Sequence, residues 1–120
     1  MAAATKIVDR KVFYAGQTVF KMGEMGDRAY LVQEGLIEIV RPNPNGPGEK
    51  VLGTIGPGGI FGEMALIDAQ PRMASARAQE QTTVIIIGQQ QFTDKLGKAD
   101  PFIRALLNIF VRNIREMAKR

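Results

Sequence analysis

Apolar residues between positions 11 and 88 occur in short or alternating runs that are separated by glycine-rich turns. Short strands at this spacing are typical of an all-β barrel or sandwich. The Pro42–Gly48 segment, PNPNGPG, contains three prolines and interrupts any regular element. The pattern predicts seven strands, at Val12–Tyr14, Thr18–Phe20, Ala29–Gln33, Leu36–Val40, Val51–Ile55, Met73–Ala78 and Thr83–Ile87.

The pattern changes after position 88 and becomes helical. We expect a short helix at Gln89–Leu96 and a longer one from Pro101 to about Ala118, because Asp100 can cap its first N–H groups and proline fits the first helical position. Apolar residues then recur at spacings of four, three, four and three, as on one face of an amphipathic helix. This apolar stripe consists of Ile103, Leu107, Phe110, Ile114 and Met117. We therefore predict one domain over residues 1–120, with a barrel at about 11–88 and C-terminal helices at about 89–118.

Composition removes several classes of function. The 120 residues include no cysteine and no histidine, so thiol chemistry and the commonest general base and metal ligand are absent. No apolar run approaches the roughly 18 residues of a membrane span, and MAAATKIVDRK lacks the apolar core of a signal peptide. The net charge of +4 fits a solvated helix face, and no nucleic-acid-binding module is evident. We expect a cytoplasmic binding protein with no cofactor, not an enzyme.

The segment Phe61–Ala78, FGEMALIDAQPRMASARA, holds most of the candidate chemistry. Gly62 and Glu63 begin a short helical turn, where unpaired N–H groups favour an anion. We expect the amides of Met64 and Ala65 to donate to a phosphate, and the forked guanidinium of Arg72 to add a fixed charge. The carboxylate of Glu63 would repel a phosphate and is better suited to accept from a sugar hydroxyl.

Two further observations concern the residues around Arg72. Strand alternation puts Arg72, Ala74, Ala76 and Ala78 on one face, and their small side chains leave room for a close backbone-to-ligand approach. The purely structural alternative is an ion pair of Arg72 with Glu63 or Asp68.

The whole segment resembles the phosphate-binding cassette of cyclic nucleotide-binding domains, and the resemblance extends from about Val12 to the terminal helix. It includes the positions of barrel glycines and aromatic residues at Gly16, Phe20, Gly23, Gly26-Asp27, Tyr30 and Gly35. The family occurs in regulatory subunits of protein kinase A, in catabolite activator proteins and in gated channels. The resemblance implies an eight-stranded, jelly-roll barrel (a double-stranded β-helix) with flanking helices.

The resemblance also implies the site residues. Glu63 would bind the ribose 2′-OH, Arg72 the cyclic phosphate, and Gly62, Met64, Ala65 and Met73 would contribute through their backbones, with Ala74 beside them. Relatives that select cyclic GMP often carry threonine after the arginine. Met73 has no hydroxyl for guanine, which favours cyclic AMP.

The C-terminal stripe has three interpretations. It packs on the barrel as core, which we favour, or it forms a lid over the ligand base, with Arg112 or Arg115 reaching the base, or it pairs with a second copy in a homodimer. As a sensor, the domain would transmit ligand binding through a hinge near Gly88–Leu96 to this helix. The alternative function is a degenerate barrel that binds no nucleotide and serves as a protein-interaction or dimerisation scaffold.

Overall fold

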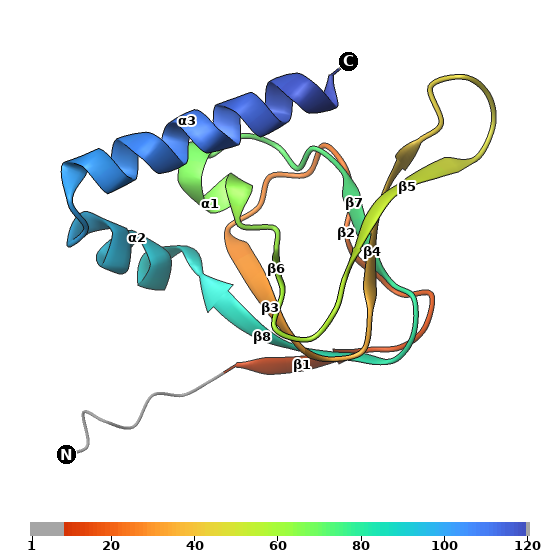
Figure 1. Cartoon of the computed structure of the whole chain (residues 1–120). Helices are drawn as coiled ribbons and strands as arrows, with labels where there is room; N and C mark the ends of the chain where they lie inside the picture. The colour runs from red at the N-terminus through yellow and green to blue at the C-terminus, as the bar shows by residue number, and fades with distance from the viewer. Residues whose placement is uncertain (1–8, 120) are drawn as a thin grey trace.

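Two antiparallel four-stranded sheets form the body of the protein in the computed structural model, which describes residues 9–119 (Figure 1). The first sheet has the order β1 (Arg10–Phe13), β8 (Thr82–Gly88), β3 (Arg28–Glu34) and β6 (Ile60–Phe61). The second has the order β2 (Thr18–Phe20), β7 (Ser75–Ala78), β4 (Ile37–Pro42) and β5 (Glu49–Ile55). This arrangement confirms the predicted jelly-roll barrel. The prediction about a leader segment at residues 1–8 lies outside the described residues.

The core lies between the two sheets. It is built from the side chains at every second position along the strands, which point inward. In β7 the pattern is clear, because Ala76 and Ala78 are buried while Ser75 and Arg77 are not. The stacked rings of Tyr30 and Phe61, with centroids 5.1 Å apart, fill one end of this core. The buried apolar cluster consists of Phe13, Tyr30, Val32, Ile37, Phe61, Ala76, Ala78 and Val84.

The strand predictions differ from the structure mainly at element ends. The two residues of β6 were not predicted as a strand, because an element this short carries no periodicity of its own and forms only by pairing with Tyr30 and Leu31 of β3. Pro42, predicted to be in a loop, ends β4 opposite Glu49 of β5. The last predicted cassette strand begins at Ser75 instead of Met73, so Arg72 lies in the preceding loop.

Three helices accompany the barrel: α1 (Met64–Asp68), α2 (Gln89–Gly97) and α3 (Pro101–Ala118). The start of α3 is the predicted one, since Asp100 accepts a hydrogen bond of 2.8 Å from the amide of Phe102, and Pro101 is the first helical residue. Figure 1 shows α3 lying across α1 at the end of the barrel where β6 passes into α1. No helix among residues 9–119 is long and apolar enough to cross a membrane.

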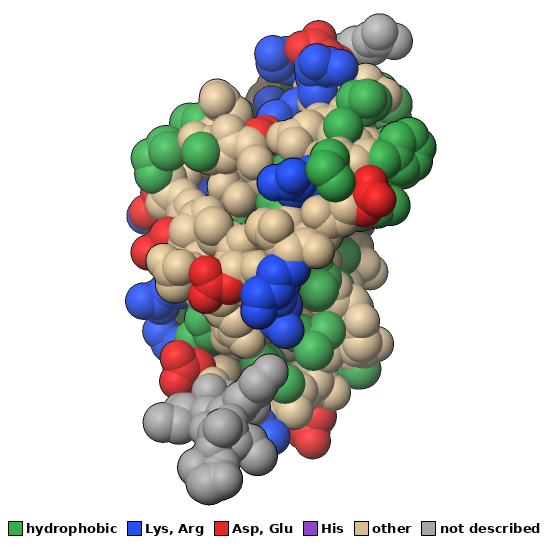
Figure 2. Space-filling view, turned by 90° about the vertical axis from the view of Figure 1, so that its left-hand side faces the viewer, with side chains coloured by type: hydrophobic (Ala, Val, Ile, Leu, Met, Phe, Trp, Pro, Cys, Tyr) green, Lys and Arg blue, Asp and Glu red, His purple; other side chains and the backbone are tan. Residues whose placement is uncertain are grey.

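The favoured interpretation of the C-terminal stripe as barrel core is wrong. Phe110 is 52% exposed and Met117 is 64% exposed, and Ile103 and Ile114 are exposed as well. The inward side of α3 carries instead Arg104, Val111 and Arg115, about 100° around the helix from the stripe. Four of the five stripe residues are therefore exposed at the side of the helix, while Leu107 is half-buried. Hydrophobic side chains are visible in the upper part of the surface in Figure 2.

Candidate functional site

Arg72 is the central charged residue of the site, and its side chain is buried with 7% exposure. Its Nη1 donates to the carbonyl oxygen of Gly62 at 2.7 Å, and its Nη2 donates to the carbonyl oxygen of Arg28 at 2.8 Å. The ion pairs found within residues 9–119 include none between Arg72 and Glu63 or Asp68. The alternative of a structural ion pair is therefore wrong.

The space for this guanidinium is created by one aromatic ring and two glycines. The ring of Phe20 lies against the guanidinium, with its centroid 4.1 Å from Cζ, a cation–π contact. A Cβ at Gly26 would lie 2.2 Å from Cζ of Arg72, and a Cβ at Gly62 would lie 2.9 Å from Nη1. Gly62 also has φ of 77°, which side chains rarely adopt. Side chains at these two positions would displace the arginine.

The electrostatics of the site favour an incoming anion. Burial lowers the pKa of the Arg72 guanidinium, and Tyr30, Asp27, Glu24 and Glu63 act in the opposite direction. The group stays protonated at neutral pH. Its buried Nε has no hydrogen-bond acceptor within residues 9–119, and an unpaired buried donor typically costs about 1–3 kcal/mol. An anionic ligand that accepts from Nε would remove this cost and offset the buried charge.

The start of α1 brings further donors to the same place. Glu63 occupies the N-cap position and makes no capping hydrogen bond with its side chain. Within the described part of the chain, the amides of Met64 and Ala65 have no backbone acceptor. Such unpaired N–H groups are expected in the first turn of a helix. Together with Arg72 they form one electropositive wall.

These groups line an open pocket with a volume of about 160 Å³. This is smaller than a typical small-molecule site of roughly 300–1,000 Å³. All seven residues proposed from the sequence lie in its wall: Gly62, Glu63, Met64, Ala65, Arg72, Met73 and Ala74. The rest of the lining is apolar apart from Arg115 and consists of Phe20, Ile39, Ile55, Ile60 and Phe61. The pocket therefore offers an apolar surface for a flat ring and a charged corner for an anion.

Sequence reasoning found the charged corner and missed most of what shapes it. Phe20 and Gly26 were named as barrel positions, and their contact with Arg72 was not predicted, because nothing in the spacing of a loop shows which side chain it packs against. Ile39 and Ile55 were not predicted as lining residues either. Arg115 lines the pocket and Arg112 is exposed outside it, and the expectation that one of the two reaches the ligand base stays a prediction.

Comparison with known proteins agrees with this fold. Residues 10–98 match the family "Cyclic nucleotide-binding domain". The cyclic AMP receptor protein of Thermus thermophilus is 30% identical over 113 residues, which are 94% of this chain and 52% of that protein. The CRP-like cAMP-activated global transcriptional regulator of Mycobacterium tuberculosis is 31% identical over 115 residues, 96% of this chain and 51% of that protein.

Solved structures give the same result. The cAMP-bound form of the EAL enzyme Bd1971 superposes with a TM-score of 0.85 at 33% identity, over 91% of this chain and 29% of that one. The cGMP-bound form of the same enzyme gives a TM-score of 0.84 at 32% identity, over 92% of this chain and 29% of that one. This chain thus spans about half or less of the length of these relatives. On its fold, its pocket and these matches, the chain belongs to the cyclic nucleotide-binding domain family.

Proposed function

We propose that this chain binds cyclic AMP in the pocket around Arg72 and acts as a regulatory domain. The supporting observation is the buried guanidinium of Arg72, a lining residue of the pocket, which has an unpaired Nε and no carboxylate partner among the described residues. In this proposal the cyclic phosphate accepts hydrogen bonds from Arg72 and from the amides of Met64 and Ala65. Each bond to a charged partner contributes about 1.5–3 kcal/mol, so three of them account for much of the roughly 8 kcal/mol of micromolar binding.

The remaining pocket residues are assigned to the sugar and the base. Glu63 accepts from the ribose 2′-OH, because the 3′ and 5′ oxygens of a cyclic nucleotide belong to the phosphate. The backbones of Gly62 and Met73 and the small side chain of Ala74 let the ligand approach closely. Met73 offers no hydroxyl to guanine, and this favours cyclic AMP over cyclic GMP.

In this regulatory role, the barrel and the C-terminal helices act together as one sensor domain that carries out no catalysis. Ligand binding moves α2, which follows β8 directly at Gly88, and repositions α3. A coupling between ligand and helix is typically about 1–3 kcal/mol. It requires that α3 makes different contacts in the two states, since equal contacts transmit nothing.

Calorimetric titration with cyclic AMP and cyclic GMP tests the proposal. We expect micromolar binding of cyclic AMP, weaker binding of cyclic GMP, and at least a hundredfold loss of cyclic AMP affinity in Arg72→Ala, since two charge-assisted hydrogen bonds disappear. The matched control is Arg10→Ala, which removes an exposed guanidinium that donates to Gln33 on the first sheet. It should bind like the wild type.

Absence of binding up to millimolar cyclic AMP would overturn the receptor function and leave the scaffold function. If the two nucleotides bind with equal affinity, the proposed effect of Met73 on base preference is wrong, while the receptor function still holds.

We also propose that the exposed stripe of α3 pairs with a second copy of this chain. The supporting observation is that Ile103, Phe110, Ile114 and Met117 are all exposed on one side of the helix, at the alternating spacing of a helix–helix seam. Analytical ultracentrifugation should show a dimer that Phe110→Ser converts to a monomer. Phe102→Ser removes a still more exposed ring that lies outside the stripe and should leave the dimer intact. A wild-type monomer at high concentration would overturn this assignment.

A further inference from the structure

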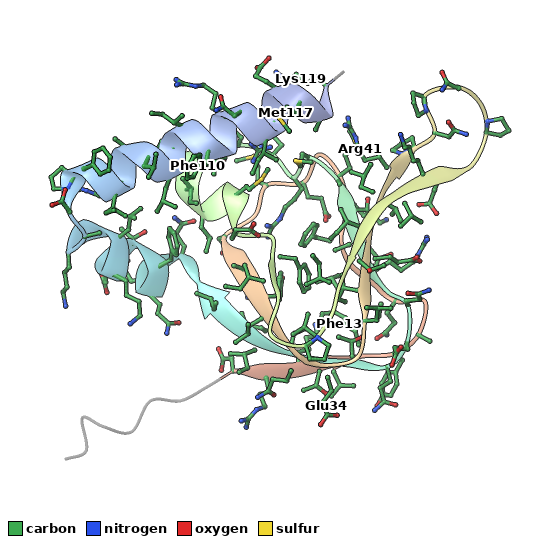
Figure 3. All side chains as sticks on the ribbon, viewed as in Figure 1. Phe13, Glu34, Arg41, Phe110, Met117 and Lys119 are labelled. Atoms are coloured by element: carbon green, nitrogen blue, oxygen red, sulfur yellow. The ribbon has the colours of Figure 1, made fainter. Side chains whose placement is uncertain are left out.

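Two arginines fasten the C-terminal half of α3 to the barrel. The guanidinium of Arg115 binds both carboxylate oxygens of Asp68, through Nε to Oδ2 and through Nη2 to Oδ1 at 3.0 Å. Its Nη1 also donates to the carbonyl oxygen of Pro71 at 2.9 Å. In the last turn of α3, Nη1 of Arg41 on β4 donates to the carbonyl oxygen of Ala118 at 2.6 Å, and Figure 3 shows Arg41 near this end of the helix.

Apolar packing accounts for only part of the docking of α3. Within the described residues, Val111 is the one buried side chain of the helix, and Leu106 and Leu107 are half-buried. By contrast, the side chains of Arg115 and Asp68 are only 15% and 19% exposed. A pair this sheltered is screened less than a surface pair, and the loss of one partner leaves a charge without compensation. Loss of either partner of this pair should therefore weaken the docking of α3.

The contacts of Arg115 reach both of the segments that form the anion site. Asp68 is the last residue of α1, and the first turn of α1 presents the amides of Met64 and Ala65 to the pocket. Asp68 Oδ1 also accepts from the amide of Gln70 at 3.1 Å, which fixes the turn after α1. Pro71 directly precedes Arg72 in the chain. One guanidinium on α3 thus holds α1 from one side and the backbone next to Arg72 from the other.

We propose that Arg115 is a positioning residue, a latch that makes the docking of α3 and the geometry of the anion site depend on each other. Because Asp68 and Pro71 move with the segments that carry the amide donors and Arg72, the site is held in its binding geometry only while α3 is docked. The part of this inference that concerns ligand binding rests on the proposed function. The part that concerns the docking of α3 does not. By linkage, an anion that tightens the site must also tighten the docking of α3 to the same extent.

Hydrogen exchange without any ligand tests the docking half. In Arg115→Gln and in Asp68→Asn we expect the amides of residues 105–116 to exchange about tenfold faster than in the wild type, because α3 leaves the barrel more often. The amides of β3, β4 and β8 should keep their protection, which shows that the barrel is intact. The control is Arg112→Gln, which removes an exposed guanidinium from the same helix and should change nothing. If the α3 amides of both Arg115→Gln and Asp68→Asn exchange at the wild-type rate, the inference is overturned.

Titration of the same variants with cyclic AMP tests the coupling half. Arg115→Gln and Asp68→Asn should each weaken binding about five- to tenfold, and the double variant should lose clearly less than the product of the two single losses, since both remove the shared ion pair. Effects that add in the double variant would overturn the latch, because they would mean that Arg115 and Asp68 act separately. If the wild type binds no cyclic AMP, the proposed function fails, and the exchange experiment still decides whether Arg115 holds α3.

Discussion

The barrel and α3 bury their apolar residues to very different extents. In the barrel, Val32, Ile37 and Val84 are almost completely buried and interlock across the two sheets. In α3, Phe110 and Met117 are more than half exposed, and polar contacts of arginine fasten the helix. A region held by few buried apolar contacts opens at lower free energy than a packed core. The difference indicates that the barrel fixes the shape of the pocket, while α3 is the element that can move.

The largest expected contrast in stability comes from truncating one apolar side chain in each region. Ile37→Ala should lower the free energy of unfolding by about 2–5 kcal/mol, because it opens a cavity in the packed core. Phe102→Ala, at a side chain of α3 that is 68% exposed, should change it by less than about 0.5 kcal/mol. Urea denaturation measures both values, and similar losses would contradict the distinction between the two regions.

A methyl group at Gly26 tests the packing of the site without replacing any of the proposed ligand-binding residues. The added Cβ would lie 2.2 Å from Cζ of Arg72, so the guanidinium must move. We expect cyclic AMP affinity to fall about 10- to 100-fold, equivalent to one charge-assisted hydrogen bond, with the barrel still folded.

Gly46→Ala is the matched control for this prediction. A Cβ there has no neighbour within 4 Å, so calorimetry should give wild-type affinity. If Gly26→Ala also binds like the wild type, the guanidinium does not depend on the space that Gly26 leaves.

One identical substitution in both regions sharpens the comparison further. Val84 in β8 and Val111 in α3 are both buried, and the loss of two methyl groups removes about 1.6 kcal/mol of burial free energy. Val84→Ala should weaken the whole barrel, so hydrogen exchange accelerates in β1, β3 and β8 together. Val111→Ala should accelerate exchange in α3 alone. Acceleration of barrel amides by Val111→Ala would show that α3 and the barrel unfold as one unit.

The smallest expected effect is a change in alkaline stability. Burial raises the pKa of the Tyr30 phenol, with Arg72 and Arg28 opposing it. The folded protein then keeps this proton at a pH where the unfolded chain has lost it, so stability is unaffected below about pH 9 and falls as pH rises above about 10. The slope from this group is at most about 1.4 kcal/mol per pH unit.

Tyr30→Phe should remove this part of the alkaline decline, and denaturation at pH 9 to 11 measures it. The control Tyr14→Phe changes an exposed tyrosine outside the core and should keep the decline. Equal slopes in Tyr30→Phe and the wild type would show that the Tyr30 phenol does not control the decline.

The sequence predicted the barrel well because strand alternation and glycine turns are local signals, as in the buried alanines of β7. It predicted Arg72 and Glu63 because their spacing belongs to one continuous segment. It did not predict the contacts of Phe20 and Gly26 with Arg72, or of Arg115 with Asp68, which join residues 46 to 52 positions apart. The stripe on α3 was placed inward for the same reason, since periodicity shows that a helix is amphipathic and does not show which face meets the barrel.

The most direct test of the anion site is a crystal structure of this chain with cyclic AMP. We predict that phosphate oxygens lie about 2.7–3.1 Å from Arg72 Nε and from the amides of Met64 and Ala65, with the ribose 2′-OH on Glu63. A nucleotide bound elsewhere, or in this pocket with its phosphate turned away from Arg72, would contradict the account.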